Sequence, residues 1–542
     1  MKLGTRILLF IIAVIVTLFI IASGVISTYL SRWATREVNK ALLSIPDWDA
    51  SCGQVQVGLI AGSTTLKDVR LSYRSTCDST NVRPGSDIRI ERIELTHNLF
   101  SFMRFHEIRL NTLQVFRPKI ELWLDEEHPE RSFPTFTIDT TVFNPNDLPA
   151  VKVLLNSLHV KNASLALHSV RTKLDVAADS CSLSMQHFCY DSVFSCCDSL
   201  YSLSVGQAKI LFPDSLMMLS VCDLTHRNAS EILLGATHIR NTMPKKQLAD
   251  IVEEPVTWID MQMDSIRISP LNPFRMAQSS DFAIDHIQAH VAFMDIFRDE
   301  RYKPRRIYTM PQPVLMALPV TFDVMRTDAV IDNIHIAFAA TDNNIGHLDM
   351  QQIDAGVDHI TNRRGETIHL SGHCPFGTGW AEAAFDLAMN DSSTFGMHIH
   401  ATDINTSVMD HFIRPLVGMT SDCVIDTLDT HYTGTNYAAR GTYRMLYHDF
   451  SIRVHKEDDI PFPIITKHAK TFNTLGNTLI PKTNQKYSKP TGYYVAWTRD
   501  ERKPTELYLF GPIIDGIKKT FLPGLYVHMR TKDNKIVEID SK

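Results

Sequence analysis

A hydrophobic pattern of eight residues recurs along this chain, with apolar side chains at its first, third, sixth and eighth positions; we call this pattern the octet. Alternation predicts a strand with one apolar face, but the three-residue step in the middle of the octet breaks the period of two. A β-bulge at that step would return all four apolar residues to one face, so the pattern predicts bulged strands in a strongly curved sheet. Two octets lie within residues 87–125, and their apolar residues are Ile88, Ile90, Ile93 and Leu95, then Ile108, Leu110, Leu113 and Val115.

The octet returns four times farther along the chain. Other alternating runs lie between these copies, for example in residues 172–185 and 329–339, and few segments have the period of an amphipathic helix. The pattern therefore predicts a mainly β protein with a long, mostly antiparallel sheet. The four later octets are Val153, Leu155, Leu158 and Val160; Met261, Met263, Ile266 and Ile268; Phe282, Ile284, Ile287 and Ala289; and Leu348, Met350, Ile353 and Ala355.

A few segments outside the strands have patterns of their own. Residues 32–45 predict a short amphipathic helix that ends before Pro46. The proline-containing segment 301–313 is typical of a linker or lid, and residues 456–491 predict another irregular region. A last helix is expected from Pro512, with one side formed by Ile513, Ile514, Ile517 and Phe521, and packing of that helix on the sheet is favoured over contact with a membrane.

Residues 7–31 form an uncharged, apolar run near the amino terminus. Such a run is long enough to cross the hydrocarbon core of a bilayer as a helix, and it exceeds the usual apolar region of a cleaved signal peptide. We therefore expect a single membrane anchor, with a cleaved signal peptide as the alternative. Basic residues lie on both sides of the run, so charge does not decide its orientation.

Composition excludes some classes of partner. The chain has 54 Lys and Arg residues against 60 Asp and Glu residues, and it has no basic run interleaved with aromatic residues, so we do not expect nucleic acid as a partner. Nine cysteines include the adjacent Cys196 and Cys197 but no metal-binding pair spacing. Buried free thiols are the favoured interpretation, although an oxidising compartment would allow a few disulfides.

No common catalytic or cofactor motif occurs in the sequence. On one strand, His398 and His400 would share a face and resemble a metal-ligand pair, but no third ligand can be named. His373 and Cys374, with His369 nearby, suggest a nucleophilic thiol. A turn between strands explains the same glycine- and proline-containing segment more simply. We therefore predict a protein that is not an enzyme and that has no cofactor or metal site.

The octets have two possible structural roles. Their apolar residues form the core of a closed β-sandwich, or they line a face that stays open to a ligand. An exposed apolar face normally marks an interaction site, and a sheet face tied to a bilayer would suit acyl chains. Each methylene group moved from water onto such a face gains about 0.8 kcal/mol. The octet residues are therefore candidates for contact with lipid.

Three stretches, read together, resemble a known family. They are VQVGLIAGSTTLKDVRLSY at residues 55–73, the double-octet segment at residues 88–122, and DTLDTHYTGTNYAARGTYRMLYHDFSIRV at residues 426–454. In this order after an N-terminal helix, they are similar to the AsmA-like family of Gram-negative envelope proteins, relatives of TamB and of the bridge-like lipid-transfer proteins. The resemblance implies an inner-membrane anchor, a periplasmic body shaped as a long, taco-like β-groove, and a role in phospholipid transport and envelope maintenance.

Together these inferences predict a membrane anchor in residues 1–31, a β region with short helices in 32–125, a groove body in 126–455 and a C-terminal region in 456–542. The expected partners are a phospholipid or other acyl-chain lipid, the membrane and possible envelope proteins. The leading hypothesis is a lipid-transfer protein, and the groove candidates are the first two octets with the octet at Met261. A non-enzymatic assembly factor acting through its sheet edges is the first alternative, and a hydrolase using His373 and Cys374 is the second.

Overall fold

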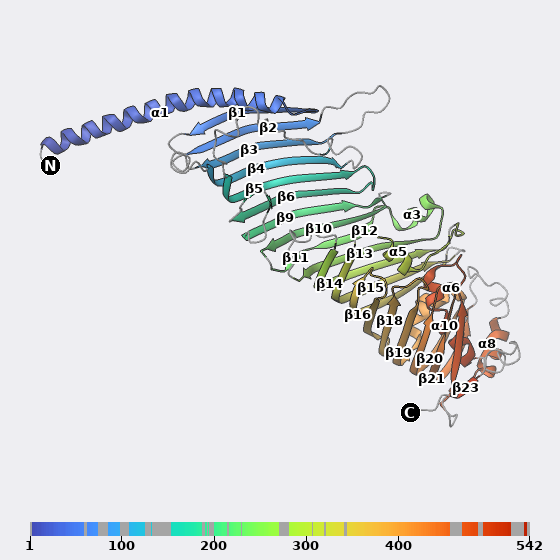
Figure 1. The fold of residues 1–542 in the computed structure, drawn as a ribbon. Coiled ribbons are helices and arrows are strands. Elements are labelled where there is room, and N and C mark those ends of the chain that lie inside the picture. The colour runs from blue at the N-terminus through green and yellow to red at the C-terminus, as the bar shows by residue number, and fades with distance from the viewer. Residues whose placement is uncertain are drawn as a thin grey trace, which may run out of the picture. The chain divides into compact units, whose positions relative to one another are not determined.

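The computed structural model of the chain describes most of the sequence. The described residues are 3–58, 62–73, 85–97, 108–124, 132, 153–186, 190–191, 193–194, 200–213, 216–228, 230–269, 281–305, 307–318, 321–340, 344–455, 469–485, 491–521 and 536–538. They form two compact units, Met1–Leu234 and Gly235–Lys542. Both units consist mainly of strands (Figure 1), so the prediction of a mainly β protein is confirmed.

Unit 1 is a sheet whose strands follow one another in chain order, β1-β2-β3-β4-β5-β6-β9-β10-β11. Neighbouring strands are antiparallel except for β4 and β5, which are parallel. The elements are α1 (Leu3–Leu43), β1 (Trp48–Gly58), β2 (Ser63–Tyr73), β3 (Asp87–His97), β4 (Ile108–Leu124), β5 (Val153–Ser169), β6 (Asp175–Gln186), β7 (Tyr190–Asp191), β8 (Val193–Phe194), β9 (Leu200–Leu211), β10 (Met217–Arg227) and β11 (Ile232–Leu234).

Helix α1 runs without a break from Leu3 to Leu43. The helix expected in residues 32–45 and its end before Pro46 are confirmed, but it is the last part of α1 and not a separate short helix, because no proline interrupts residues 3–43. The side chains of residues 3–22 lie outside the described part of the chain. Within the described part, no helix has both the length and the apolar character of a membrane span.

Unit 2 is also a sheet in chain order: from β12 to β23, each strand pairs with the next strand in the chain. Among these described pairs of unit 2, β14 and β15 are parallel and the others are antiparallel. The strands are β12 (Thr237–Asn241), β13 (Val256–Ile268), β14 (Asp281–Asp299), β15 (Thr321–Ala339), β16 (Ile345–Thr361), β17 (Thr367–Phe376), β18 (Gly379–Ala388), β19 (Phe395–Asn405), β20 (Met419–Gly434), β21 (Ala438–Val454), β22 (Thr491–Thr498) and β23 (Ile536–Glu538).

Short helices accompany the strands of unit 2, most of them near the carboxyl end of the chain. Two predicted irregular segments contain helices: α8 lies inside the segment 456–491, of which residues 456–468 and 486–490 lie outside the described part, and α5 begins at the end of the segment 301–313. The helix expected from Pro512 is confirmed as α10. The helices are α3 (Lys245–Val252), α5 (Pro311–Met316), the 3₁₀ helix η4 (Thr406–Met409), α6 (Asp410–Val417), α8 (Ala469–Leu479), α9 (Thr505–Leu509) and α10 (Gly511–Phe521).

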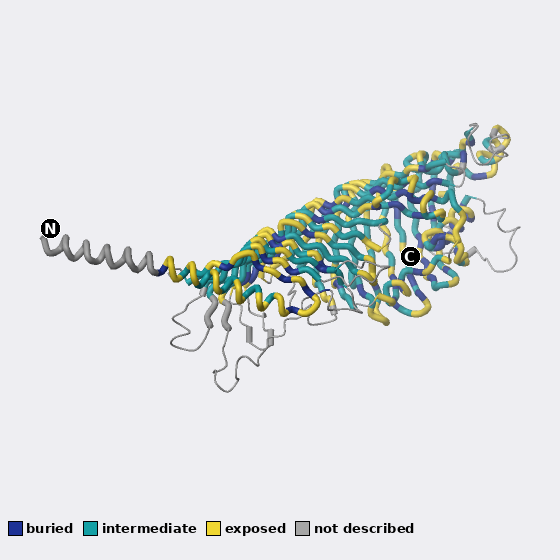
Figure 2. The backbone as a smooth tube through the Cα atoms, turned by 90° about the horizontal axis from the view of Figure 1, so that it is seen from above, coloured by how far each residue is buried: buried dark blue, intermediate teal, exposed yellow. Residues whose placement is uncertain are grey.

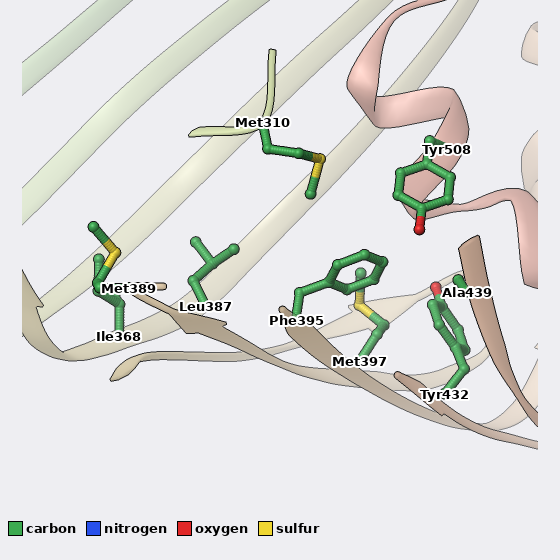
Figure 3. Close-up of a cluster of buried hydrophobic side chains, with 9 residues drawn as sticks. All are labelled: Met310, Ile368, Leu387, Met389, Phe395, Met397, Tyr432, Ala439 and Tyr508. Carbon is green, nitrogen blue, oxygen red and sulfur yellow. The ribbon is translucent and has the colours of Figure 1, made fainter. Parts of the chain in front are cut away.

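The largest buried cluster lies between strands β17–β21 and the helices that cover them (Figure 3). Phe395 is only 1% exposed and lies edge-on to Tyr508 of α9, with 5.6 Å between the ring centroids. Met310 is also 1% exposed, so the segment before α5 is part of this core. The described residues of the segment 301–313 before α5 form no helix or strand, as expected of a linker, but the segment is packed on the sheet, because the apolar Met310 is stabilised by burial there.

Candidate functional site

The three-residue steps of the first two octets fall at irregular positions of the sheet. In β3, Glu91 is skipped in the pairing on both sides, opposite Asp68 of β2 and Arg117 of β4. Asp68 and Arg117 have positive φ angles of 52° and 46°. Between β3 and β4, the register shifts from Thr96 to His97 of β3, and this shift makes Asn111 of β4 the extra residue. The predicted bulge is therefore confirmed in β4, whereas in β3 one residue of each strand is skipped and the register does not shift.

Later octets behave in the same way. Between β13 and β14, the register shifts on each side of Met263, so that Ala292 of β14 and Asp264 of β13 are extra residues on their strands. In β16, Gln352 has a φ of 52° at the step between Met350 and Ile353. The octet in β5 lies in register with the octet in β4. The two strands are parallel, and each apolar residue of one octet is paired with the equivalent residue of the other. A repeated sequence pattern thus becomes a repeated side-chain position.

The consequence is a set of apolar rows that cross unit 1 from strand to strand; we call the surface they form the apolar face of unit 1. Residues paired in register lie side by side on one face of a sheet. One row is Leu71, Ile88, Ile120, Leu165, Ala178, Ala208 and Val221. A second is Val55, Leu66, Ile93, Val115, Val160, Leu183 and Leu203. A third is Leu95, Leu113, Leu158, Met185 and Tyr201.

Helix α1 covers one end of this face. Its residues Ala34, Val38 and Leu42 pack against a core that includes Trp48 and Val55, each 1% exposed. The candidate residues Ile88, Ile90 and Ile93 lie at the border of that core and are half-buried.

Beyond β3, the described part of unit 1 contains no α-helix that could cover the face. Leu113, Val115, Leu158 and Val160 remain partly exposed. Intermediate burial accordingly predominates along the strands in Figure 2. The side chains of Ile108 and Leu110 lie outside the described residues, although their backbone continues the rows.

The opposite face of the same strands is polar. Phe116 lies there between two cations: the guanidinium of Arg92 is 4.1 Å and the ammonium of Lys161 is 5.2 Å from the centroid of its ring. Both cations belong to residues paired with Phe116 on the neighbouring strands. The face that bears the octets and the face that bears these charges are therefore distinct, as alternation requires.

The octet residues of unit 2 also gather on one face. Met263 is buried beside Val291 and Ile331, and Met261 and Ile266 pack against them. Every member of this cluster comes from strands β12–β16, so the residues bury one another within the sheet. The candidates Met261, Met263 and Ile266 are brought together, while Ile268 is half-buried in the next row, beside Ile287.

Sheet edges are the site of the alternative function, and a helix closes the first of them. Polar side chains of α1 recur every four residues and bind the backbone of β1, where a further strand would otherwise pair. Asn39 both accepts from and donates to the backbone of Cys52, at 2.8 Å in each case, and Ser27 donates to the carbonyl of Val57. The amides of Val57, Val55 and Cys52 donate to the side chains of Ser31, Thr35 and Asn39 at 2.9, 2.9 and 2.8 Å.

The same arrangement closes two edges of unit 2. In α8, Asn473 and Asn477 accept from the amides of Val454 and Ile452 of β21, at 2.6 and 2.9 Å. In α10, Asp515 accepts from the amide of Ala496 and Lys519 donates to the carbonyl of Tyr494, at 3.1 and 2.8 Å. Spacing of four residues places both side chains on the helix face that meets the strand.

The proposed metal pair does not become a site. Both His398 and His400 approach the same carboxylate oxygen of Asp429, at 3.6 and 3.3 Å. Within the described residues, no group of three or more His, Cys, Asp or Glu side chains is arranged to hold a metal ion. The shared face of the two histidines, predicted from their spacing, is nevertheless compatible with these contacts to Asp429.

The proposed nucleophile is also not assembled. Successive residues His373 and Cys374 lie inside β17, so their side chains point to opposite faces. His373 is 3.3 Å from the carboxylate of Asp354, and burial raises the pKa of the Cys374 thiol, which disfavours the reactive thiolate. His369 pairs with Asp386 at 2.7 Å. The turn predicted in residues 369–377 lies at the end of that segment, at Gly377, because alternation continues β17 to Phe376 and β18 begins at Gly379.

Thiols are unpaired wherever the structure describes them. Cys52, Cys181, Cys222, Cys374 and Cys423 are free cysteines, two of them buried. Cys196 and Cys197 lie outside the described residues.

Comparison with known proteins does not identify a family. No protein-family model matches the sequence, and no curated protein is similar to it at a significant level. The function is therefore inferred from the geometry of the chain and from the resemblance in its sequence.

Proposed function

We propose that this chain is a membrane-anchored lipid-binding protein whose apolar sheet face accepts the acyl chains of phospholipids. The observation that carries the proposal is the apolar face of unit 1. Its rows continue in register through at least five strands, and beyond β3 the described residues place no helix over them. A partly exposed apolar surface of this extent is stabilised when it is covered by an apolar ligand.

The shape of the rows suits an acyl chain. An apolar stripe from Ile88 to Leu95 extends along one strand for roughly 23 Å, at about 3.3 Å per residue. Neighbouring strands repeat the stripe about every 4.8 Å. The surface is thus continuous in both directions, as a ligand with a long, flexible hydrocarbon tail requires, and it offers no polar pattern that would select a small polar molecule.

We further propose that residues 7–31 anchor the chain in the inner membrane of a Gram-negative cell and that the body forms a taco-like groove in the periplasm. The uncharged run and the resemblance to the AsmA-like family support this location. In that setting the chain would transfer phospholipid between membranes and maintain the envelope, without a catalytic step.

The alternative, an assembly factor that receives the strand of another protein at a sheet edge, is less well supported. Such factors need an edge with unpaired backbone groups. Side chains of α1, α8 and α10 occupy backbone groups at the edges of β1, β21 and β22. A partner strand would have to displace these helices before it could pair.

Native mass spectrometry of the full chain, purified in a mild detergent and then exchanged out of it, tests the proposal. We expect co-purified phospholipid on the wild-type chain. Leu113→Asp with Leu158→Asp should remove most of it, because the two residues are neighbours on the apolar face of unit 1 and a carboxylate opposes an acyl chain there.

Gln114→Asp is the matched control, because Gln114 follows Leu113 on the same strand and points to the opposite, polar face. It introduces one carboxylate, half the charge of the double variant, and should leave the bound lipid unchanged. Lipid-free wild-type protein at full recovery, or equal loss of lipid in the control, would refute the proposal.

A further inference from the structure

The sheet of unit 2 has a hollow on the face opposite to its octet residues. Its volume is about 540 Å³, and its floor lies where Gly356, Ser371 and Ala384 are paired across β16, β17 and β18. Gly356 follows the octet residue Ala355 on its strand and therefore belongs to the other face. The small size of the three floor residues leaves the space above the strands open.

A second hollow of about 350 Å³ continues the first toward β13 and β14. Asp328 and Val330 of β15 line both hollows, so the two are adjacent; we call them together the trough. From Arg267 of β13 to His398 of β19, its lining residues are paired strand by strand. With about 4.8 Å between neighbouring strands, the trough is roughly 29 Å long, which suits a linear ligand.

The walls of the trough combine hydrogen-bond donors with acceptors. Asp328 is held by Arg326 at 2.9 Å and by His286 at 2.7 Å. Asp354 lies 3.3 Å from His373, and these two side chains remain 58% and 55% exposed. Carboxylates accept hydrogen bonds, a guanidinium donates them, and an imidazole does both. The trough therefore presents fixed partners for a ligand that carries donors and acceptors itself.

An exposed indole lies beside the trough. Trp380 of β18 is 57% exposed, and its ring centroid is 6.3 Å from that of His373, which lines the trough. Trp380 is two residues from Glu382, another lining residue, so both belong to the same face of the sheet. A large aromatic ring on a polar face gains free energy when a ligand stacks on it and removes it from water.

We propose that the trough binds a linear, uncharged oligosaccharide. The hydroxyl groups at the edge of a pyranose ring both donate and accept hydrogen bonds, as the walls of the trough require. The C–H groups on the face of the same ring can stack on an indole. The inference goes beyond the proposed lipid function and does not depend on it, because the trough lies in unit 2 and on the face opposite to the octets.

Charge argues against other ligands that stack on an indole. Besides histidines, the ionisable residues that line the trough are Arg267 and Arg326 on one side of the balance and Asp328, Asp354 and Glu382 on the other. A nucleic acid or an acidic glycan would be repelled by the three carboxylates, and an organic cation would be repelled by the two guanidinium groups. A ligand without charge avoids both costs.

Calorimetric titration of the full chain tests the inference. The chain is purified in a detergent without a sugar headgroup, because such a headgroup would compete for the trough. The neutral probes are cellohexaose, maltohexaose and chitohexaose, and we expect at least one of them to bind at millimolar concentration. Hexagalacturonate, an acidic saccharide, and spermidine, an organic cation, should bind more weakly than that probe.

Two variants and two matched controls locate the bound saccharide. Gly356→Leu should abolish binding, because its Cβ makes only ordinary contacts, the nearest at 3.4 Å, and the rest of the side chain fills the trough. Trp380→Ala should weaken binding about tenfold, because the stacking surface is lost. Gly396→Leu is the control for the first variant: Gly396 shares the face but does not line either hollow, and its nearest contact, Asp386, is at 3.5 Å. Tyr437→Ala, at a 72% exposed ring between β20 and β21, is the control for the second.

Both controls should bind the saccharide as the wild type does. A wild-type chain that binds none of the three neutral probes would overturn the inference, and so would tighter binding of hexagalacturonate or spermidine than of every neutral probe. Unchanged binding by the Trp380 variant, or an equal loss of binding in the controls, would place the saccharide elsewhere and overturn it as well. Because Trp380 is exposed, its variant decides the question even if Gly356→Leu does not fold.

Discussion

The apolar face of unit 1 and the core of unit 2 around Phe395 are built from the same kind of alternating strand, but they are completed differently. In unit 2, residues of the segment before α5 and of α9 and α10 lie over the strands, and the central side chains are almost fully buried. In unit 1, α1 covers only the first strands, and residues such as Leu158 stay partly exposed.

This difference teaches that the strand pattern decides which side chains share a face, while the connections decide whether the face is covered. An alternating strand needs an apolar neighbour on one side, and either a helix or a ligand can satisfy that need. Unit 2 carries its own cover in the chain. The apolar face of unit 1 has none in the described residues beyond β3, so the proposed lipid takes the place that the helices take in unit 2.

Removal of a covered side chain should have the largest effect. Phe395→Ala is expected to lower the free energy of unfolding of unit 2 by about 3–5 kcal/mol, because it leaves a cavity between Phe385 and Tyr508. Urea denaturation monitored by hydrogen exchange of β18 and β19 measures this loss. Phe282→Ala, at an exposed apolar residue of the same unit, is the control and should change the stability little. A loss below about 1 kcal/mol at Phe395 would mean that this core is not closed.

The edge contact of α1 should have the next largest effect. Thr35→Val with Asn39→Leu keeps the size of both side chains but removes their hydrogen bonds to Val55 and Cys52. We expect a loss of about 2 kcal/mol, since the amide of Val55 and both the amide and the carbonyl of Cys52 lose these partners at the edge. Hydrogen exchange should show faster exchange confined to β1.

Thr28→Val is the control for that prediction, because its hydroxyl donates to the carbonyl of Gly24 within the helix and not to β1. Unchanged exchange in β1 after the double substitution would mean that α1 does not protect the edge. It would also restore the alternative in which a partner strand pairs there.

Much of this fold could be predicted from the sequence, and the part that could not has a physical reason. The octets predicted the extra residues Asn111 and Asp264. They did not predict that in β3 and β16 the same step is accommodated without a shift of register, at Glu91 and Gln352. They did not predict which face is covered, since that depends on contacts such as the one between Met310 and the distant strands.

Other features were present in the sequence as spacing. Ser27, Ser31, Thr35 and Asn39 recur every four residues in α1, and this spacing indicates a polar helix face that could have predicted the contact with β1. The packing of α10 was harder to predict, because the tight approach at Gly511 and Gly516 depends on where Trp497 and Tyr443 lie. Of the predicted helix side, Ile513 and Phe521 pack inward, whereas Ile514 and Ile517 are exposed. For His398 and His400, the spacing predicted a common strand face. It could not predict that both side chains lie close to Asp429, which belongs to the neighbouring strand.

A truncation on the apolar face of unit 1 sharpens the comparison with a smaller effect. Leu158→Ala should cost only about 1 kcal/mol, because the side chain is already partly exposed and the solvent or a ligand fills the space that it leaves. Urea denaturation of the lipid-free chain measures this value. A cost near that of Phe395→Ala would show that the face is as closed as the core of unit 2, and the lipid proposal would lose its basis.

The smallest effect concerns two thiols and changes reactivity rather than stability. Burial, with Asp426 and Asp449 nearby, raises the pKa of Cys423 in unit 2 to about 12. Burial and the charge of Asp179 also raise the pKa of Cys181, which is half-buried and pairs with Ala163 of the apolar face of unit 1. The thiolate is the reactive form, and a raised pKa keeps it scarce below that pKa, so at mildly alkaline pH both thiols should react more slowly than a free cysteine.

Cys181 should nevertheless be alkylated well before Cys423, because an alkylating reagent reaches a partly open face without unfolding the chain and must unfold unit 2 to reach Cys423. Mass spectrometry of the digested protein follows each site over time. Raising the pH should accelerate both reactions, since the thiolate fraction grows toward each pKa. Added phospholipid should slow only Cys181, because the proposed ligand covers that face alone. Equal protection of both cysteines by lipid would indicate a general stabilisation of the chain, and no protection of Cys181 would place the acyl chains elsewhere.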